Sequence, residues 1–166
     1  MRFYLLGMPG SGKSFFGQEV ANQLQMTFVD TDEWIESKHN HQIAELFATQ
    51  GEGWFRREEK KCIEVICQNY ESALIATGGG LPCYHQMMHQ LLQSGICIYL
   101  KGGIEKLASQ IKMDSKIRPL LSNRSIPDIF NKLLQQREDI YLQSQHVVDI
   151  EKNPLIDIIK IIHSYA

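Results

Sequence analysis

The sequence predicts an α/β protein built on a doubly wound, five-stranded parallel sheet. A glycine-rich run, Gly7–Ser14, stands between a short apolar run and a helical pattern, which gives the order strand, turn, helix. Strand and helix candidates then alternate to the end of the chain, as they do in doubly wound folds. Three of the strand candidates are nearly unbroken apolar runs, which suits parallel strands that helices cover on both faces.

The elements follow from local pattern, beginning with the apolar run Phe3–Leu6 as the first strand. The later strand candidates are Thr27–Val29, Ala73–Ala76, Ile96–Leu100 and His146–Ile150. The helix candidates carry apolar residues three or four positions apart, as Phe16, Val20 and Leu24 do in the first helix. These candidates are Lys13–Leu24, Asp32–Lys38, Ile43–Thr49, Glu52–Gln68, His85–Gln93, Ile104–Ile111, Pro127–Ser144 and Pro154–Tyr165. Ligands of such a fold bind beyond the carboxyl ends of the strands.

Composition narrows the class of protein. A chain of 166 residues with 43% hydrophobic residues is expected to form one domain, residues 1–166, with a sizeable core. A net charge of −2 gives no broad cationic face, so we expect no nucleic-acid partner. The four cysteines form no Cys-x-x-Cys pair, which indicates a reducing compartment. The sequence shows no membrane-length apolar run and no room for a signal peptide before the first strand, so we expect a cytoplasmic protein without membrane contact.

The glycine-rich run fits the pattern G-x-x-x-x-G-K-[ST] of a phosphate-binding loop, the P-loop. Its glycines let successive backbone N–H groups turn inward, and the following helix N-terminus adds partial positive charge. Lys13 can reach the terminal phosphates of a nucleotide, and the Ser14 hydroxyl can ligate Mg²⁺. The motif therefore predicts a site for nucleotide phosphates at this turn.

Polar or glycine-rich segments also follow two other strand candidates. Asp30 and Asp32 come after the second strand, where one carboxylate can orient Mg²⁺ through its water shell and the other can accept a hydrogen bond from a substrate hydroxyl. Asp32 also fits the N-cap of the next helix. Thr77-Gly78-Gly79-Gly80 follows the third strand. Three consecutive glycines suggest that a ligand approaches the main chain closely, although a structural turn would also explain them.

Three further segments have both a functional and a plain interpretation. The polar stretch of residues 112–125 contains Arg118, and beside a P-loop it is interpreted as a mobile lid over the phosphates, with a surface loop as the alternative. Arg56 and Arg137 lie in two charged helices, where solvated charges are the plain interpretation, and spacing alone does not bring them together. His85 and His89 share a predicted helix face near a cysteine, but a zinc site would lack a fourth ligand.

With these segments in this order, the chain resembles the shikimate kinases over nearly its whole length. The segments that carry the resemblance are the P-loop, Asp30-Thr31-Asp32, Phe55-Arg56-x-x-Glu59, Thr77–Gly80, Arg118-Pro119-Leu120 and Arg137-x-x-x-Tyr141. The resemblance implies a fold like that of nucleoside monophosphate kinases, with strand order 2-3-1-4-5. It also implies transfer of the γ-phosphoryl group of ATP to the 3-hydroxyl of shikimate in aromatic amino-acid (chorismate) biosynthesis.

The resemblance further implies which residues act. Lys13, Asp32 and Arg118 would be catalytic. The ATP-binding residues would be Gly10, Ser11, Gly12, Lys13, Ser14, Phe15 and Arg118, with Lys152, Asn153 and Pro154 against adenine. Shikimate would be bound by a helical segment at about residues 32–61 and by the set Asp32, Phe47, Phe55, Arg56, Glu59, Gly78, Gly79, Gly80 and Arg137. Mg²⁺ would contact Ser14 directly and Asp30 through water, and a monomer is expected.

One departure from relatives and three rival functions complete the prediction. Relatives often carry an adenine-stacking arginine where this chain has Ile111, whose aliphatic face can cover a purine without a cation–π contribution. A gluconate or nucleoside monophosphate kinase is the nearest rival. A GTPase needs Asn-Lys-x-Asp, but Asn131-Lys132 is followed by two leucines. A non-catalytic relative is expected to lose Lys13, Asp32 or an arginine, and all are present.

Overall fold

The structure is a computed structural model that describes residues 1–113 and 125–166. Most of the predicted lid, including Arg118, lies outside these residues. In the described part of the chain, no helix combines the length and the apolar character needed to cross a membrane.

Five parallel strands form one sheet in the order β2-β3-β1-β4-β5, which confirms both the predicted sheet and the predicted strand order. The strands are β1 (Arg2–Leu6), β2 (Phe28–Asp30), β3 (Ala73–Ala76), β4 (Ile96–Lys101) and β5 (His146–Asp149). The central strand β1 pairs with β3 on one side, where Leu5 is opposite Ala76, and with β4 on the other, where Leu5 is opposite Ile98. All three central strands are almost completely buried, which is why their sequences are continuous apolar runs.

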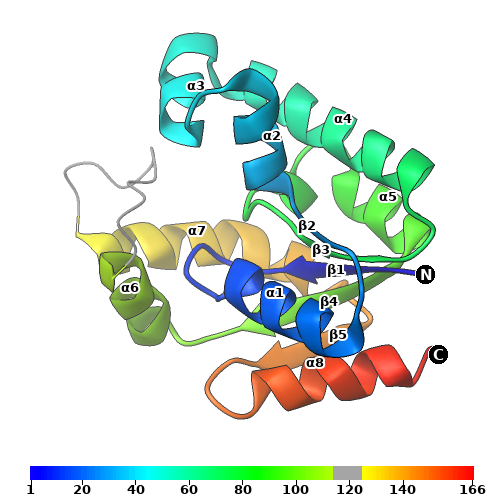
Figure 1. Cartoon of the computed structure of the whole chain (residues 1–166). Coiled ribbons are helices and arrows are strands. Elements are labelled where there is room, and N and C mark those ends of the chain that lie inside the picture. Colours follow the sequence, from blue (N-terminus) through cyan, green and yellow to red (C-terminus); the bar gives the residue numbers. More distant parts are fainter. Residues whose placement is uncertain (114–124) are drawn as a thin grey trace.

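Helices cover both faces of the sheet (Figure 1). They are α1 (Lys13–Leu24), α2 (Thr31–His39), α3 (Ile43–Gln50), α4 (Glu52–Asn69), the 3₁₀ turn η1 (Leu81–Cys83), α5 (Met87–Ser94), α6 (Ile104–Met113), α7 (Ile126–Tyr141) and α8 (Pro154–His163). Helices α1 and α8 pack together on one face, and α4, α5 and α7 lie on the other, as right-handed crossovers require for this strand order. The P-loop, α3 and α6 gather at the end of the sheet to which β1 points (Figure 1).

One predicted helix start is wrong. The helix expected from His85 begins at Met87, because His85 and Gln86 adopt left-handed conformations with φ of 50° and 58°. The turn η1, which the sequence did not predict, precedes them. His85 therefore shares no helix face with His89.

The core has a large and a small part. The large part surrounds the sheet, and the small one consists of Ile35, Leu46 and Phe55 between α2, α3 and α4. Full burial of a side chain of this kind contributes about 1.5–3 kcal/mol. The small core therefore holds α2 and α3 against α4, and these helices form the segment predicted to bind the substrate.

Candidate active site

The P-loop connects β1 to α1. The side chain of Lys13 folds back onto the backbone of this loop. The Lys13 ammonium donates to the carbonyl oxygens of Gly7 at 3.0 Å and Met8 at 2.9 Å, and it lies 3.4 Å from the Ser11 hydroxyl. Gly10 and Gly12 have φ of 80° and 81°, a region that L-residues with side chains rarely adopt. The loop thus has the curled backbone predicted from its sequence, with a buried lysine whose exposed fraction is 7%.

Asp30 joins the P-loop to α2 through both of its carboxylate oxygens. Its Oδ2 accepts a hydrogen bond from the Ser14 hydroxyl. Its Oδ1 accepts from the backbone N–H of Asp32 at 2.9 Å and of Glu33 at 3.3 Å, so Asp30 is the N-cap of α2. The alternative role of Asp32 as that N-cap is therefore wrong, and its side chain is not used to begin the helix.

The oxygens of Ser14 and Asp30 fit the preference of Mg²⁺ for hard oxygen ligands. Among the described residues, no cluster of three or more His, Cys, Asp or Glu side chains is placed to hold a metal by itself. Mg²⁺ characteristically uses one or two protein oxygens together with water and substrate phosphates, so a pair of this kind is sufficient.

Thr31 connects the end of β2 to the glycine turn after β3, a role that the sequence analysis missed. Its hydroxyl is fully buried and accepts a hydrogen bond from the backbone N–H of Gly78 at 2.9 Å. Thr77, at the start of the turn, donates its hydroxyl proton to the carbonyl of Leu5 at 3.1 Å. The turn is therefore fixed to both neighbouring strands. The pattern Asp-Thr-Asp was visible in the sequence, but the partner of its threonine was not.

The three glycines of the turn make room for other parts of the site. A Cβ atom on Gly78 would lie 2.6 Å from Glu59 Oε1 and 2.9 Å from Asp32 Oδ1. On Gly79 it would lie 3.2 Å from Pro9 of the P-loop, and on Gly80 only 2.4 Å from Arg56 Nη2. None of the three has a positive φ, so space rather than backbone conformation requires glycine here. Close approach of a ligand to this turn stays a prediction.

Arg56 is buried at the centre of a charged cluster on α4, with an exposed fraction of 6%. Its Nη1 donates to Glu59 Oε2 at 2.7 Å, and its Nη2 donates to Glu52 Oε1 at 3.1 Å. Burial raises the pKa of Glu59 to about 7, although the charge and hydrogen bond of Arg56 act to lower it. The guanidinium also lies 4.1 Å from the ring centroid of Tyr84, which the sequence analysis did not identify.

Aromatic rings border the same guanidinium. Phe47 and Phe55 have ring centroids 4.8 Å apart, and Arg56 Cζ lies 5.9 Å and 5.6 Å from them. Both phenylalanines were predicted for the substrate pocket, and the structure brings them to the arginine that was predicted to share it.

Arg137 reaches this cluster from α7. It is buried, with an exposed fraction of 5%, and its charge acts on the carboxyl groups of both Glu52 and Glu59. Four residues later, Tyr141 donates its hydroxyl proton to the carbonyl of Gly79 at 2.5 Å. The two arginines, 81 positions apart in the sequence, therefore converge beside the glycine turn.

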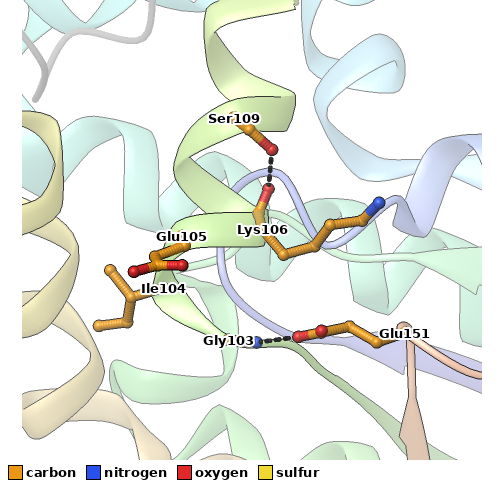
Figure 2. A pocket seen from close by; sticks show the side chains of 6 residues that line it. All are labelled: Gly103, Ile104, Glu105, Lys106, Ser109 and Glu151. Carbon is orange, nitrogen blue, oxygen red and sulfur yellow. Dashed lines mark hydrogen bonds between the residues drawn. The ribbon is translucent and has the colours of Figure 1, made fainter.

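Two cavities lie along α6 at the carboxyl end of the sheet. One, of about 530 Å³, opens over the P-loop. It is lined by Gly10, Gly12, Lys13, Ser14, Phe15, Phe16, Asp30, Asp32, Thr77, Lys106, Ser109 and Gln110. The other, of about 560 Å³, is lined by Gly103, Ile104, Glu105, Lys106, Ser109 and Glu151 (Figure 2). Lys106 and Ser109 line both, so the cavities adjoin.

None of the three residues predicted to contact adenine lines these cavities, but their neighbour Glu151 does. Figure 2 shows Glu151 at the wall of the second cavity, where its Oε1 accepts from the backbone N–H of Gly103 at 3.0 Å. Lys152, Asn153 and Pro154 follow directly in the chain but line neither cavity, and their contact with adenine stays a prediction.

The side chain of Ile111 could have covered a purine, but the structure buries it in the core. Its exposed fraction is 7%, it belongs to the large core, and its Cγ1 lies 3.0 Å from the position that a Cβ atom on Gly10 would occupy. The preceding residue, Gln110, lines the cavity over the P-loop instead.

Comparisons with known proteins agree with this arrangement. The sequence model of the shikimate kinase family matches residues 9–165. A shikimate kinase from Azobacteroides pseudotrichonymphae genomovar. CFP2 is 37% identical over 163 residues, which cover 96% of this chain and 95% of that protein. One from Parabacteroides distasonis is 32% identical and covers 91% of this chain and 88% of that protein. The structure of a shikimate kinase from Acinetobacter baumannii in complex with shikimate superimposes with a TM-score of 0.89 at 27% identity, covering 99% of this chain and 93% of that chain.

Proposed function

The chain belongs to the shikimate kinase family, and from this premise we propose that it transfers the γ-phosphoryl group of ATP to the 3-hydroxyl of shikimate, in the pathway to the aromatic amino acids. One observation carries the proposal. The turn Gly78–Gly80 touches the P-loop on one side and buried Arg56 on the other. The proposed site for the phosphates and the proposed site for the substrate carboxylate would therefore lie side by side.

The nucleotide end of the site is built from the P-loop. Backbone N–H groups of residues 10–15 would hold the phosphates, with Lys13 compensating the charge of the terminal ones. Ser14 would hold Mg²⁺ directly and Asp30 through water, where the ion neutralises charge on the phosphates. Arg118 would add a cation from the lid, and Lys152, Asn153 and Pro154 would border adenine.

The acceptor end is built from α2, α4, α7 and the glycine turn. Arg56 and Arg137 would bind the substrate carboxylate, because a guanidinium group matches a carboxylate in two hydrogen bonds and so fixes its orientation. Glu59 would orient Arg56 through the ion pair described above. Phe47 and Phe55 would cover the apolar part of the ring, and backbone atoms of Gly78, Gly79 and Gly80 would line its edge.

Transfer depends mostly on position and charge. Phosphoryl transfer passes through a loose transition state, so holding the acceptor hydroxyl in line is worth more than removing its proton early. Asp32, which faces Gly78 together with Glu59, would hold that hydroxyl and take its proton as the new O–P bond forms. We also propose that the enzyme works as a cytoplasmic monomer, without nucleic acid or membrane.

The test is ADP release with each component omitted in turn. Release should need ATP, Mg²⁺ and shikimate together, and gluconate or a nucleoside monophosphate should not replace shikimate. Equal rates with gluconate would move the assignment to the nearest rival kinase. No shikimate-dependent release at any concentration would leave a protein that keeps the fold without the reaction.

A further inference from the structure

Glu52, the first residue of α4, lies on the open side of the charged cluster. Its side chain keeps an exposed fraction of 48%, whereas that of Arg56 keeps 6%. Burial by itself would raise the pKa of Glu52, but hydrogen bonds from Tyr84 and Arg56 and the charge of Arg137 lower it. The carboxylate is therefore ionised and in contact with, or close to, both arginines.

These are the same arginines to which the proposed function assigns the carboxylate of the substrate. We propose that Glu52 is an internal carboxylate that competes with the carboxylate of the substrate for Arg56, and that its displacement sets the affinity of this site for carboxylate ligands. The inference rests on the proposed function. The proposed function assigns only residues that favour substrate binding. Glu52 would be a residue that opposes it.

Glu52 is the displaceable member of the two glutamates on Arg56. The side chain of Glu59 keeps an exposed fraction of 2% and binds at 2.7 Å, so moving it would leave a buried charge without its partner. Glu52 can swing into water, where a half-exposed ion pair is worth little. It follows Gly51, which has a φ of 82° and no atom within 4 Å of the position of a Cβ atom. The start of α4 therefore has space to move.

The Nε–H donor of Arg56, which is unpaired in the part of the chain that the structure describes, indicates which kind of group replaces Glu52. Nε and Nη2 form one edge of the planar guanidinium group, which a carboxylate can bind with two parallel hydrogen bonds. Nη2 donates to Glu52, but Nε is buried and has no hydrogen-bond acceptor among the described residues. A substrate carboxylate on this edge supplies the missing acceptor and takes Nη2 from Glu52. The exchange then leaves no donor on that edge unpaired.

Charge balance predicts how selective the effect is. With Glu52 in place, the positive charge of Arg56 is shared with two carboxyl groups. Removing one negative charge should strengthen the binding of an anionic ligand and leave a neutral analogue nearly unaffected. The methyl ester of shikimate has the same ring and hydroxyls without the charge, so it separates electrostatic competition from a change in pocket shape.

The experiment is calorimetric titration of shikimate and its methyl ester into wild type and Glu52→Gln. We expect Glu52→Gln to bind shikimate about fivefold to tenfold more tightly and to bind the ester within about twofold of wild type. Glu64→Gln is the matched control. It makes the same change on the same helix at a residue that is 54% exposed and lies 4.0 Å from Lys60. Its affinities for both ligands should equal those of wild type.

Equal or weaker binding of shikimate by Glu52→Gln overturns the inference, because it would make Glu52 a support for Arg56 rather than a competitor. Glu52→Ala is the second variant and must shift affinity in the same direction. Thermal unfolding of each variant shows whether a loss of binding reflects a loss of fold. Failure of the proposed function looks different, since wild type itself would then neither bind shikimate nor release ADP with it.

Discussion

Replacing Gly80 by alanine tests whether the glycine turn sets the position of Arg56. Gly80 has φ −85° and ψ −18°, which alanine adopts without strain. The added Cβ atom would lie 2.4 Å from Nη2, 2.6 Å from Nη1 and 2.7 Å from Cζ of Arg56, whereas ordinary contact begins at 3.4 Å. The guanidinium must therefore withdraw by about 0.7–1 Å. It is buried and bound to Glu59, so it cannot withdraw without disturbing that ion pair.

A shift of about 1 Å in a positioning group can cost on the order of 100-fold in rate. We expect Gly80→Ala to raise KM for shikimate by about 10- to 100-fold, equivalent to about 1.4–2.7 kcal/mol, and to leave KM for ATP within about twofold. Steady-state ADP release at varied shikimate and ATP measures both. The control is Gly53→Ala on α4, where a Cβ atom would meet only Arg57 at an ordinary 3.7 Å. A wild-type KM for shikimate in Gly80→Ala would refute the reasoning.

Four further outcomes are expected. Lys13→Ala should abolish transfer while circular dichroism and thermal unfolding stay close to wild type, because its ammonium is the cation of the P-loop. Arg137→Ala should weaken shikimate binding in calorimetry far more than ATP binding, and equal losses for both ligands would contradict its role. Ile111→Ala should lower the free energy of unfolding in urea by about 2–4 kcal/mol, as expected for a core residue, with little change in KM for ATP. Burial opposes ionisation of Glu58, but hydrogen bonds with Lys61, Lys38 and His39 hold its pKa at about 2, below the ordinary 4.5. Its stabilising contribution is therefore present above pH 4.5 and lost as the pH falls toward 2, so the urea midpoint should fall more steeply on acidification in wild type than in Glu58→Gln.

The sheet could be predicted from sequence because its cause is local. Each central strand is buried on both faces, so burial alone makes its sequence apolar, and the runs at Ala73–Ala76 and Ile96–Leu100 needed no knowledge of their neighbours. The first helix has the predicted bounds, Lys13–Leu24, because the P-loop fixes where it begins. The strand order came from the family resemblance, since periodicity says nothing about which strands pair.

The parts that escaped prediction depend on contacts between distant segments. No local pattern in the sequence distinguishes Tyr84 from a loop tyrosine that has no role in the site, yet the guanidinium group of Arg56 lies over its ring. The sequence also did not show whether Ile111 faces a purine or the core, whereas in the structure its side chain packs against the P-loop and belongs to the core. The left-handed residues His85 and Gln86 are likewise positions where tertiary structure overrides helical pattern.

The glycine turn links the two ends of the site, and the sequence alone did not show this link. Three separate elements hold the turn, through the Thr31 hydroxyl, the Tyr141 hydroxyl and the packing of Pro9, and a fourth places Arg56 against it. A change in the turn therefore alters the distance between the two ends of the site, even where the core is untouched. Because phosphoryl transfer depends on that distance more steeply than folding does, substitutions here should reduce activity at a small cost in stability. Substitutions in β1 or β3 should do the reverse, since those strands build the core and reach the site only through the P-loop and the glycine turn that follow them.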